Sequence, residues 1–360
     1  MGSGLCVRRP QPLIGRVATL SPNTGEGEQM QAIQLTETGG PDVLAIRDVP
    51  DPVAGPGEVV IELRASALNR RDIFLRKGVA PSPLPVIPGS DGAGVVRTVG
   101  PGVSGVSEDD EVIILPSLGW GDGEAAPAPG FRILGGPDDG TYAELISIPA
   151  ENIYPKPARL SWEEAAALPL AGLTAWRALM SRCGLQPGET VLILGIGGGV
   201  ATFALHLAKA HGARVIVTSS SDEKLARAAE LGADFGVNYR SDDWVDRVKE
   251  LTGGVDVAID SVGSTWADTI NCLAPGGRMA VFGGTGGAKV ELMVRPVTAP
   301  QISILGTTMG SPRDFAGLLA AVDASTWVPV IDSVRPLAEA VDAHEREETG
   351  GHFGKLVLVP

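Results

Sequence analysis

The sequence predicts an α/β protein in which a β-rich first part precedes a doubly wound parallel sheet. Between residue 30 and about residue 155, short strand-like runs are separated by Gly/Pro turns, which indicates a small barrel or sandwich. From residue 190 onward, apolar strand-like runs alternate with amphipathic helical segments, which indicates a parallel sheet covered by helices on both faces. The length of 360 residues and the hydrophobic content of 44% are sufficient for about two domains.

Composition excludes several kinds of partner. The net charge of −14 and the pI of about 4.8 argue against nucleic acid or an anionic membrane. No apolar run approaches the roughly 18 residues that a transmembrane helix needs. The three cysteines, Cys6, Cys183 and Cys272, are far apart and odd in number, which is typical of a reducing compartment. We therefore expect a cytoplasmic protein with no nucleic-acid or membrane partner.

The N-terminal residues 1–29 differ in composition from the rest of the chain. They are rich in Gly, Pro, Ser, Glu and Gln and show no hydrophobic period. We expect a disordered extension, and the alternative is a start site placed too early, with Met30 as the true first residue.

The first part is expected to span residues 30–157. Residues 116–140 form a loop rich in Gly, Pro and Asp, and loops of this length are usually functional or mobile. The strands expected before that loop are Met30–Leu35, Glu58–Ala65, Gly92–Val99 and Glu111–Leu115.

The second part is expected to span residues 158–310. Ser161 and Glu164 have the spacing of a capping box ahead of an Ala/Leu-rich helix. Residues 311–360 should add one helix and then a strand, Lys355–Val359. The strands expected in the parallel sheet are Val191–Leu194, Arg214–Thr218, Asp234–Asn238, Val255–Asp260, Arg278–Phe282 and Ile302–Leu305. The helices expected between them are Val200–His211, Asp222–Leu231 and Trp244–Leu251.

A glycine-rich turn follows the first strand of this sheet. The run from Gly195 to Ala201 reads GIGGGVA and opens a helix. Glycines allow a tight turn that brings backbone N–H groups against a pyrophosphate, and the helix N-terminus adds partial positive charge. The spacing departs from Gly-x-Gly-x-x-Gly, and an ordinary strand–helix turn is the alternative. Its place at the start of an alternating series favours dinucleotide binding.

The end of the next strand indicates which dinucleotide binds. NAD-selective sites place Asp or Glu there, whereas this strand ends in Ser219 and Ser220, with Lys224 shortly after. Small hydroxyls leave room for a 2′-phosphate, and a lysine supplies a compensating charge. These residues predict NADPH. The competing interpretation is that Ser220 and Glu223 form a capping box and that Lys224 is a solvated helix lysine.

Four segments together resemble the medium-chain dehydrogenase/reductase family. The resemblance covers residues 30–360 and implies a GroES-like catalytic domain over 30–157, a Rossmann domain with a six-stranded parallel sheet over 158–310, and a C-terminal return to the catalytic domain over 311–360. The matching segments are Ala67–Asp72 (ALNRRD), Pro88–Val96 (PGSDGAGVV), Leu168–Trp176 (LPLAGLTAW) and Gly195–Ala201.

The residues at the family's metal positions differ from those of its zinc-dependent members. Those members carry Cys where this chain has Asn69, and His-Glu where it has Ser90 and Asp91. They also carry four cysteines in the loop that here spans 116–140, which contains none. Amide and hydroxyl groups do not replace thiolate and imidazole as zinc ligands. We therefore expect neither a catalytic nor a structural zinc, and a place in the quinone reductase branch.

In that branch Asn69 matches an active-site asparagine of the pattern Asn-x-x-Asp. Phe74 stands where the branch often carries an aromatic hydroxyl, which removes one possible donor to the substrate. Asp72 is the only carboxylate of the motif, and both a structural hydrogen bond and a chemical role are open to it. Arg70 and Arg71 are adjacent and are expected to be solvated, and the alternative is that they flank the entrance of the site.

The resemblance also implies which residues contact the cofactor and which oligomeric state the protein has. It implies a homodimer formed through the sheet edges of the Rossmann domains. Plain turn chemistry is the alternative for the Gly and Thr positions. The implied cofactor contacts are Thr174, Gly195, Gly198, Gly199, Val200, Ser219, Ser220, Lys224, Tyr239, Val262, Gly263, Gly283, Gly284, Thr307, Thr308, Phe353 and Lys355.

The sequence thus predicts hydride transfer from NADPH to a quinone or an α,β-unsaturated carbonyl. Such acceptors need little acid assistance, because their oxyanion is delocalised. Two alternatives stay open: a zinc-independent alcohol or aldehyde dehydrogenase of the same family, and a non-catalytic NADPH-binding protein.

Overall fold

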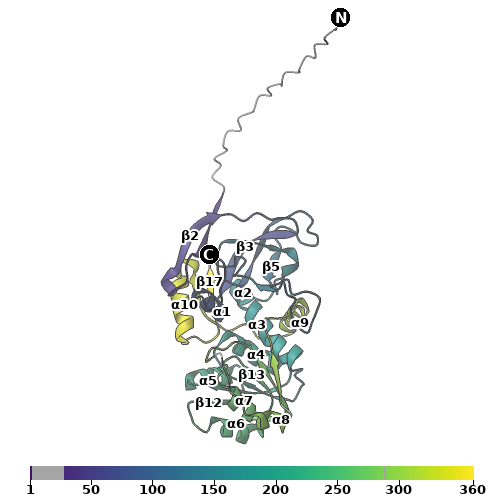
Figure 1. The fold of residues 1–360 in the computed structure, drawn as a ribbon, viewed down its shortest axis with the longest axis vertical. Coiled ribbons are helices and arrows are strands. Elements are labelled where there is room, and N and C mark those ends of the chain that lie inside the picture. Colours follow the sequence, from purple (N-terminus) through teal and green to yellow (C-terminus); the bar gives the residue numbers. More distant parts are fainter. Residues whose placement is uncertain (2–27, 288) are drawn as a thin grey trace.

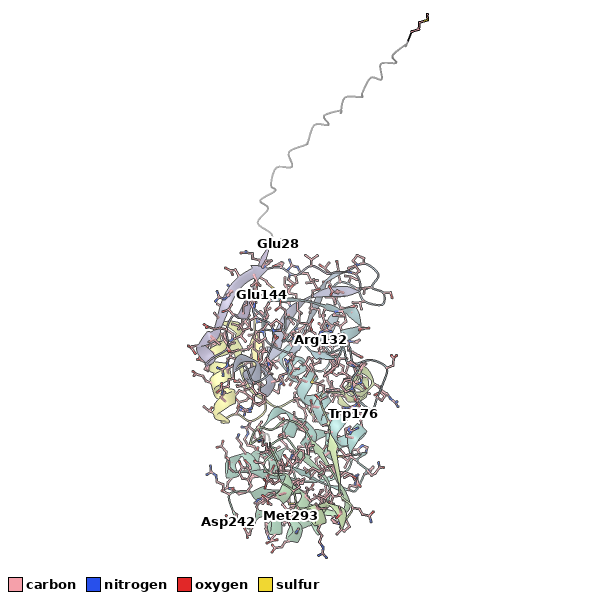
Figure 2. All side chains as sticks on the ribbon, viewed as in Figure 1. Glu28, Arg132, Glu144, Trp176, Asp242 and Met293 are labelled. Carbon is pink, nitrogen blue, oxygen red and sulfur yellow. The ribbon has the colours of Figure 1, made fainter. Side chains whose placement is uncertain are left out.

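The structure is a computed structural model that describes residue 1, residues 28–287 and residues 289–360. Two parts are stacked along the long axis, with the β-rich part above and the parallel sheet below (Figure 1). Glu28, Glu144 and Arg132 lie on the β-rich part, and Asp242 and Met293 lie at the far end of the other (Figure 2). The extension expected at residues 1–29 falls almost entirely outside the described residues, and the first strand begins at Gln29.

The β-rich part contains a seven-stranded sheet and a β-hairpin. The sheet order is β16-β17-β3-β4-β5-β9, with β8 paired to β3, and β1 pairs with β2. Its strands are β1 (Gln29–Leu35), β2 (Leu44–Pro50), β3 (Glu58–Ala67), β4 (Asp91–Val99), β5 (Glu111–Ile114), β8 (Leu145–Pro149), β9 (Ile153–Pro155), β16 (Ile331–Pro336) and β17 (Lys355–Val359). Two short strands, β6 (Ser117–Leu118) and β7 (Arg132–Ile133), lie within the long loop, and α1 (Arg70–Arg76) follows β3.

Strand β3 contributes apolar side chains to the cores on both of its faces, and Arg64 is its one exposed residue. Val59, Ile61 and Leu63 point into one apolar cluster, whereas Val60 belongs to a second cluster on the opposite face. This alternation follows from the period of two along a strand. The last three residues of β3, Ala65–Ala67, are all buried, so this end of the strand can hold the start of α1 in place.

The second part is the six-stranded parallel sheet that the sequence predicts. Its order is β12-β11-β10-β13-β14-β15. Strands β11 and β12 therefore lie on one side of β10, and β13, β14 and β15 lie on the other. The turn after β10 therefore lies at the topological switch point, where such sheets bind ligands. The strands are β10 (Thr190–Ile193), β11 (Arg214–Ser219), β12 (Phe235–Asn238), β13 (Val255–Asp260), β14 (Leu273–Val281) and β15 (Ser303–Gly306). The helices are α4 (Gly199–Ala210), α5 (Asp222–Glu230), α6 (Trp244–Thr252), α7 (Trp266–Cys272) and α8 (Val294–Thr298).

A helical connection joins the two parts. The capping box is confirmed: Glu164 N donates to Ser161 Oγ over 3.2 Å, and Ser161 N donates to a Glu164 carboxylate oxygen over 2.9 Å. The expected single helix is divided at Pro169, which has no N–H to continue the ladder. It forms α2 (Trp162–Ala167), which packs on β3 and β4, and α3 (Pro169–Trp176), which packs on α4. A π-helical segment, Arg177–Arg182, continues α3.

The prediction for the C-terminal residues was incomplete. Strand Lys355–Val359 is confirmed, but α9 (Pro312–Asp323) is followed by the additional strand β16 and by α10 (Ala340–Thr349). Helix α10 buries Ala340, Ala343, His344 and Glu347, which have helical spacing but include only two small apolar side chains. Its hydrophobic period is therefore too weak to recognise in the sequence.

Within the described residues, no helix is long and apolar enough to cross a membrane. Cys183 and Cys272 are buried and free. The third cysteine, Cys6, lies outside the residues that the structure describes.

Candidate active site

The glycine-rich turn has the geometry expected of a phosphate-binding turn. Gly195 and Gly197 have φ of 69° and 117°, a region that favours glycine. Space is open around Gly195, where an added Cβ would meet nothing within 4 Å. Gly198 caps α4, a helix of 12 residues whose first N–H groups have no intrahelical acceptor. The turn, with Gly199 and Val200 in the first helical positions, therefore fits a pyrophosphate group.

The next strand end differs in one detail from the expectation. Ser221, not Ser220, caps α5, because Ser221 Oγ accepts from Lys224 N over 3.3 Å. The proposed Ser220–Glu223 capping box is therefore wrong, because the N-cap is Ser221 and only its side chain takes part in the cap. Ser219 is buried, and its hydroxyl accepts from Ser221 N over 3.1 Å. Ser220 is half-buried and is not used by the cap, so it can contact a ligand at the strand end.

Lys224 bridges the phosphate turn and the C-terminal segment. Its Nζ donates to Gly350 O over 2.7 Å, and its side chain lies against Gly197. Burial lowers the pKa of Lys224, since the charged amine is partly removed from water. The interpretation as a solvated helix lysine is therefore wrong. Tyr239 is 47% exposed just after β12, and its N donates to Ser219 O over 3.1 Å, so it lies beside the same strand end.

The later candidate residues lie at the same edge of the sheet. Gly286 N donates to Val262 O over 2.7 Å, and Gly263 approaches Gly287 so closely that an added Cβ would meet its carbonyl at 2.4 Å. Thr307 N donates to Val281 O over 3.0 Å. The pairs that follow β13, β14 and β15 at this edge are Val262 and Gly263, Gly283 and Gly284, and Thr307 and Thr308.

Thr174 and Phe353 are held by local contacts. The Thr174 hydroxyl donates to Leu170 O over 2.8 Å, within its own helix. Phe353 is buried, with Arg227 stacked 4.2 Å from its ring centre. The neighbouring Gly354 N donates to Gly197 O over 2.9 Å, which brings the C-terminal segment onto the phosphate turn.

Asp72 has a structural role in the motif that contains Asn69. One Asp72 carboxylate oxygen accepts from Asn69 N and from the Tyr142 hydroxyl, each over 2.9 Å. Asp72 is fully buried, and this burial raises its pKa to about 6. Its hydrogen bonds cap α1 and fix the backbone of Asn69.

A buried cluster surrounds the Asn69 side chain. Asn69 Nδ2 donates to Asp91 Oδ2 over 2.9 Å, and Lys355 Nζ donates to Asn69 Oδ1 over 2.7 Å and to Asp91 Oδ2 over 2.9 Å. Asp91 Oδ1 accepts from Leu170 N over 2.8 Å. Lys355 therefore directs its amine at Asn69 and Asp91, and it reaches the phosphate turn only through its methylene groups, which lie against Gly199.

Arg71 lies next to this cluster and is not solvated as expected. Its side chain is 20% exposed, and Nη1 donates to Ser90 Oγ and to Leu134 O, each over 2.8 Å. Ser90 Oγ also donates to Leu134 O over 2.7 Å. Arg71 therefore anchors the end of the long loop to the motif. The sequence offered one weak indication that Arg71 is partly buried, namely its position next to Asp72 in the Asn-x-x-Asp motif.

The loop 116–140 is anchored at a second place. Arg177 donates to Glu124 O and Ala125 O over 2.8 Å and 3.2 Å, and its guanidinium lies 4.7 Å from the centre of the Trp120 ring. The same guanidinium pairs with Asp314 over 2.6 Å. The loop is thus held against α3 and α9, on one side of the molecule.

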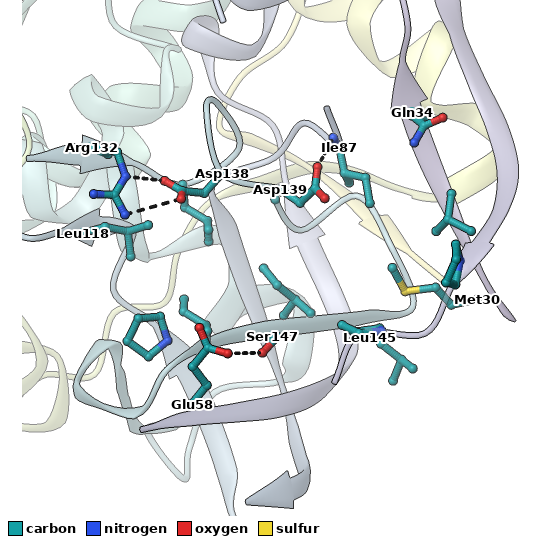
Figure 3. Close-up of a pocket in the computed structure, with 18 residues that line it drawn as sticks. Met30, Gln34, Glu58, Ile87, Leu118, Arg132, Asp138, Asp139, Leu145 and Ser147 are labelled. Carbon is teal, nitrogen blue, oxygen red and sulfur yellow. Dashed lines mark hydrogen bonds and ion pairs between the residues drawn. The ribbon is translucent and has the colours of Figure 1, made fainter. Parts of the chain in front are cut away.

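A separate cavity of about 450 Å³ lies within the β-rich part. Figure 3 shows its lining, which includes Met30 and Gln34 of β1, Leu145 and Ser147 of β8, and the Arg132–Asp138 ion pair. None of the predicted site residues lines it. The candidate active site is therefore built at the sheet edge and around Asn69.

Comparison with known proteins identifies the family of this chain. Residues 55–158 match the family described as the alcohol dehydrogenase GroES-like domain, and residues 199–324 match the family described as zinc-binding dehydrogenase. A quinone oxidoreductase from Mus musculus is 33% identical over 345 residues, covering 92% of this chain and 98% of that protein. A zinc-type alcohol dehydrogenase-like protein from Schizosaccharomyces pombe is 38% identical over 315 residues, covering 84% and 91%. A solved structure described as an NAD-dependent alcohol dehydrogenase superposes with a TM-score of 0.87 at 42% identity, covering 92% of this chain and all of that one.

This chain therefore belongs to the medium-chain dehydrogenase/reductase family, with a GroES-like part and a Rossmann part. Members of this family are oxidoreductases that use a nicotinamide cofactor.

Proposed function

We propose that this protein is a zinc-independent oxidoreductase that uses NADPH to reduce a quinone or an α,β-unsaturated carbonyl. The observation that carries the proposal is the set of side chains at the positions that hold zinc in other members. Asn69, Ser90 and Asp91 offer an amide, a hydroxyl and one carboxylate. Within the described residues, no group of three or more His, Cys, Asp or Glu side chains could hold a metal ion.

Charge supports the same conclusion. Two cations already contact these positions, since the Lys355 amine lies at Asn69 and Asp91 and the Arg71 guanidinium lies at Ser90. A zinc ion placed among them would meet electrostatic repulsion from both and would lack thiolate and imidazole ligands. The residues therefore do not fit zinc.

The nicotinamide cofactor fits the site. Gly195, Gly197 and the start of α4 would hold the pyrophosphate, and Ser220 and Lys224 would hold the 2′-phosphate. When bound, NADPH supplies the hydride. Asn69 Nδ2 donates one hydrogen to Asp91, and its second has only Ala67 O at 3.5 Å. This second donor can stabilise the oxygen of the acceptor, and water can supply the proton because Asp72 is committed to its cap.

The decisive test is NADPH oxidation by the purified, metal-analysed protein with phenanthrenequinone, with NADH in parallel. We expect turnover without bound metal and a preference for NADPH of about tenfold or more in kcat/KM, as differential binding of one phosphate provides. Tight NADPH binding without turnover would instead favour a binding role. Stoichiometric zinc together with alcohol oxidation would overturn the interpretation of Asn69 and Ser90. Alcohol oxidation without bound metal would support the second candidate, a zinc-independent alcohol or aldehyde dehydrogenase, since a similar solved structure is an NAD-dependent alcohol dehydrogenase.

Lys224→Met tests the phosphate specificity. Loss of a charge-assisted hydrogen bond costs about 1.5–3 kcal/mol, so we expect the Kd for NADPH to rise about 10- to 100-fold. The Kd for NADH should change less than about threefold, because NADH lacks the 2′-phosphate. Binding is measured by fluorescence titration, with Lys209→Met as the control, since Lys209 pairs with Asp234 away from the turn. An equal loss for both cofactors would mean that Lys224 acts through its contact with Gly350.

We further propose a cytoplasmic homodimer. Strand β15 pairs only with β14 among the described strands, so its other edge is available for pairing. Cys183 and Cys272 are buried free thiols, which agrees with a reducing compartment.

A further inference from the structure

Lys355, Asn69 and Asp91 form a closed ring of hydrogen bonds. Lys355 Nζ has three N–H donors, which are directed at Leu68 O over 2.5 Å, Asn69 Oδ1 over 2.7 Å and Asp91 Oδ2 over 2.9 Å. Asn69 Nδ2 closes the ring on Asp91. The three residues are 3%, 7% and 0% exposed, so water does not compete for these contacts.

This ring fixes the orientation of the Asn69 amide. Turning the amide over would place its NH₂ against the Lys355 ammonium and its carbonyl oxygen against the Asp91 carboxylate. Both new contacts would be repulsive, and two charge-assisted hydrogen bonds would be lost. In the observed orientation, the second Nδ2–H keeps only the long contact to Ala67 O.

The ring also connects the amide to the cofactor site. Lys355 methylene groups lie against Gly199, where an added Cβ would meet Lys355 Cδ at 2.8 Å. Asp91 Oδ1 holds Leu170 N in the first turn of α3, the helix that carries Thr174. Lys355 and Asp91 thus fix the position of Asn69 relative to both the phosphate turn and α3.

We infer that Lys355, paired with Asp91, is the positioning residue of the reaction: it orients and polarises the Asn69 amide so that the free Nδ2–H donates to the acceptor oxygen. This inference rests on the proposed function. The ammonium draws electron density from Asn69 Oδ1, which makes the Nδ2–H a stronger donor, as in a chain of hydrogen bonds. Lys355 acts through Asn69 and does not touch the substrate.

The test separates positioning from folding. Lys355→Met leaves the Asp91 charge unpaired, so this variant is expected to lose stability as well as activity. The double variant Lys355→Met/Asp91→Asn removes both charges and should recover most of the stability. We expect its kcat to stay at least tenfold below wild type, with KM for the quinone and Kd for NADPH within about threefold. Recovery of kcat together with stability would overturn the inference.

A cycle with Asn69→Ala tests whether Lys355 acts through Asn69. In the Asn69→Ala background, the Lys355→Met/Asp91→Asn substitutions should cause no further loss of kcat, because the amide that Lys355 positions is already absent. A further tenfold loss would show that Lys355 acts by another route. Arg278→Met/Glu189→Gln is the matched control, because it removes a two-contact ion pair away from Asn69 and should leave kcat unchanged.

A readout that needs no turnover keeps the inference apart from the proposed function. The side-chain NH₂ signal of Asn69, assigned in ¹⁵N NMR spectra by its loss in Asn69→Ala, should be a single, well-separated proton pair in the wild type. In the Lys355→Met/Asp91→Asn variant, the two protons should move together or broaden as the amide reorients. An unchanged signal would overturn the inference, even if the wild type proves inactive with quinones.

Discussion

Replacing Asp91 with alanine should lower the free energy of unfolding by about 3–5 kcal/mol, the usual cost of breaking a buried ion pair from one side. The Lys355 ammonium would stay buried without its counter-ion. Asn69 Nδ2 and Leu170 N would also lose their acceptor. Burial raises the pKa of Asp91, while the nearby Lys355 charge opposes that shift, so the carboxylate depends on this one cation.

The effect is measured by urea unfolding at neutral pH, with Asp138→Ala as the control. Asp138 also pairs with a cation, Arg132, but both side chains are more than a third exposed. An exposed pair of this kind contributes about 1 kcal/mol or less. If the two variants lose equal stability, then solvent reaches the Asp91 cluster and the burial argument for Lys355 fails.

Local patterns were sufficient to predict most of the Rossmann part. Strand β13 is found over Val255–Asp260 as predicted, because its apolar run stands between glycines and polar residues. Strand β14 begins at Leu273, five residues before the predicted Arg278. The register with β13 passes directly from Val255–Leu273 to Val257–Arg278, so regular pairing begins at the predicted residue, and the residues before it form an irregularity in which Gly276 has φ of 78°.

In the candidate site, too, local sequence patterns were sufficient for some residues, whereas others depend on contacts between distant parts of the chain. The positions of the glycine-rich turn and of Ser219–Lys224 at one edge of the sheet were predictable, because each lies at the end of a strand and the strand ends of a parallel sheet meet at one edge. The partners of Asn69 were not predictable from spacing. Lys355 is 286 residues away in the chain and reaches Asn69 only because β17 pairs with β3. Tyr142, which holds Asp72, is separated from it by 70 residues.

Acid should destabilise the protein through His344, and replacing His344 with leucine should remove that part of the effect. His344 is fully buried within the β-rich part, and neither ring nitrogen has a hydrogen-bond partner among the described residues. Burial lowers the pKa of His344 to about 3, and the nearby Arg76 charge acts in the same direction. In the unfolded chain a histidine binds its proton near pH 6.5.

The sign follows from which state binds the proton. As pH falls below about 6.5, the unfolded chain gains a proton at residue 344 that the folded chain refuses, so the free energy of unfolding falls. The loss is about 1.4 kcal/mol per pH unit, or about 2 kcal/mol between pH 7.5 and 5.0. Urea unfolding should therefore show His344→Leu gaining about 2 kcal/mol over wild type between these two pH values.

A second variant, His344→Phe, separates the effect of titration from the effect of packing. His344→Phe also removes the titrating group but keeps an aromatic ring near Tyr142, whose ring centre lies 6.0 Å away at right angles. Both variants should show the same pH-dependent gain even if their stabilities at pH 7.5 differ. Asp72, whose pKa burial raises to about 6, contributes a slope of opposite sign, because the folded chain binds its proton first. That contribution is common to wild type and both variants, so it cancels in the difference. If wild type and variants lose stability in parallel, then His344 is protonated within the fold and must have access to water or to an anionic partner.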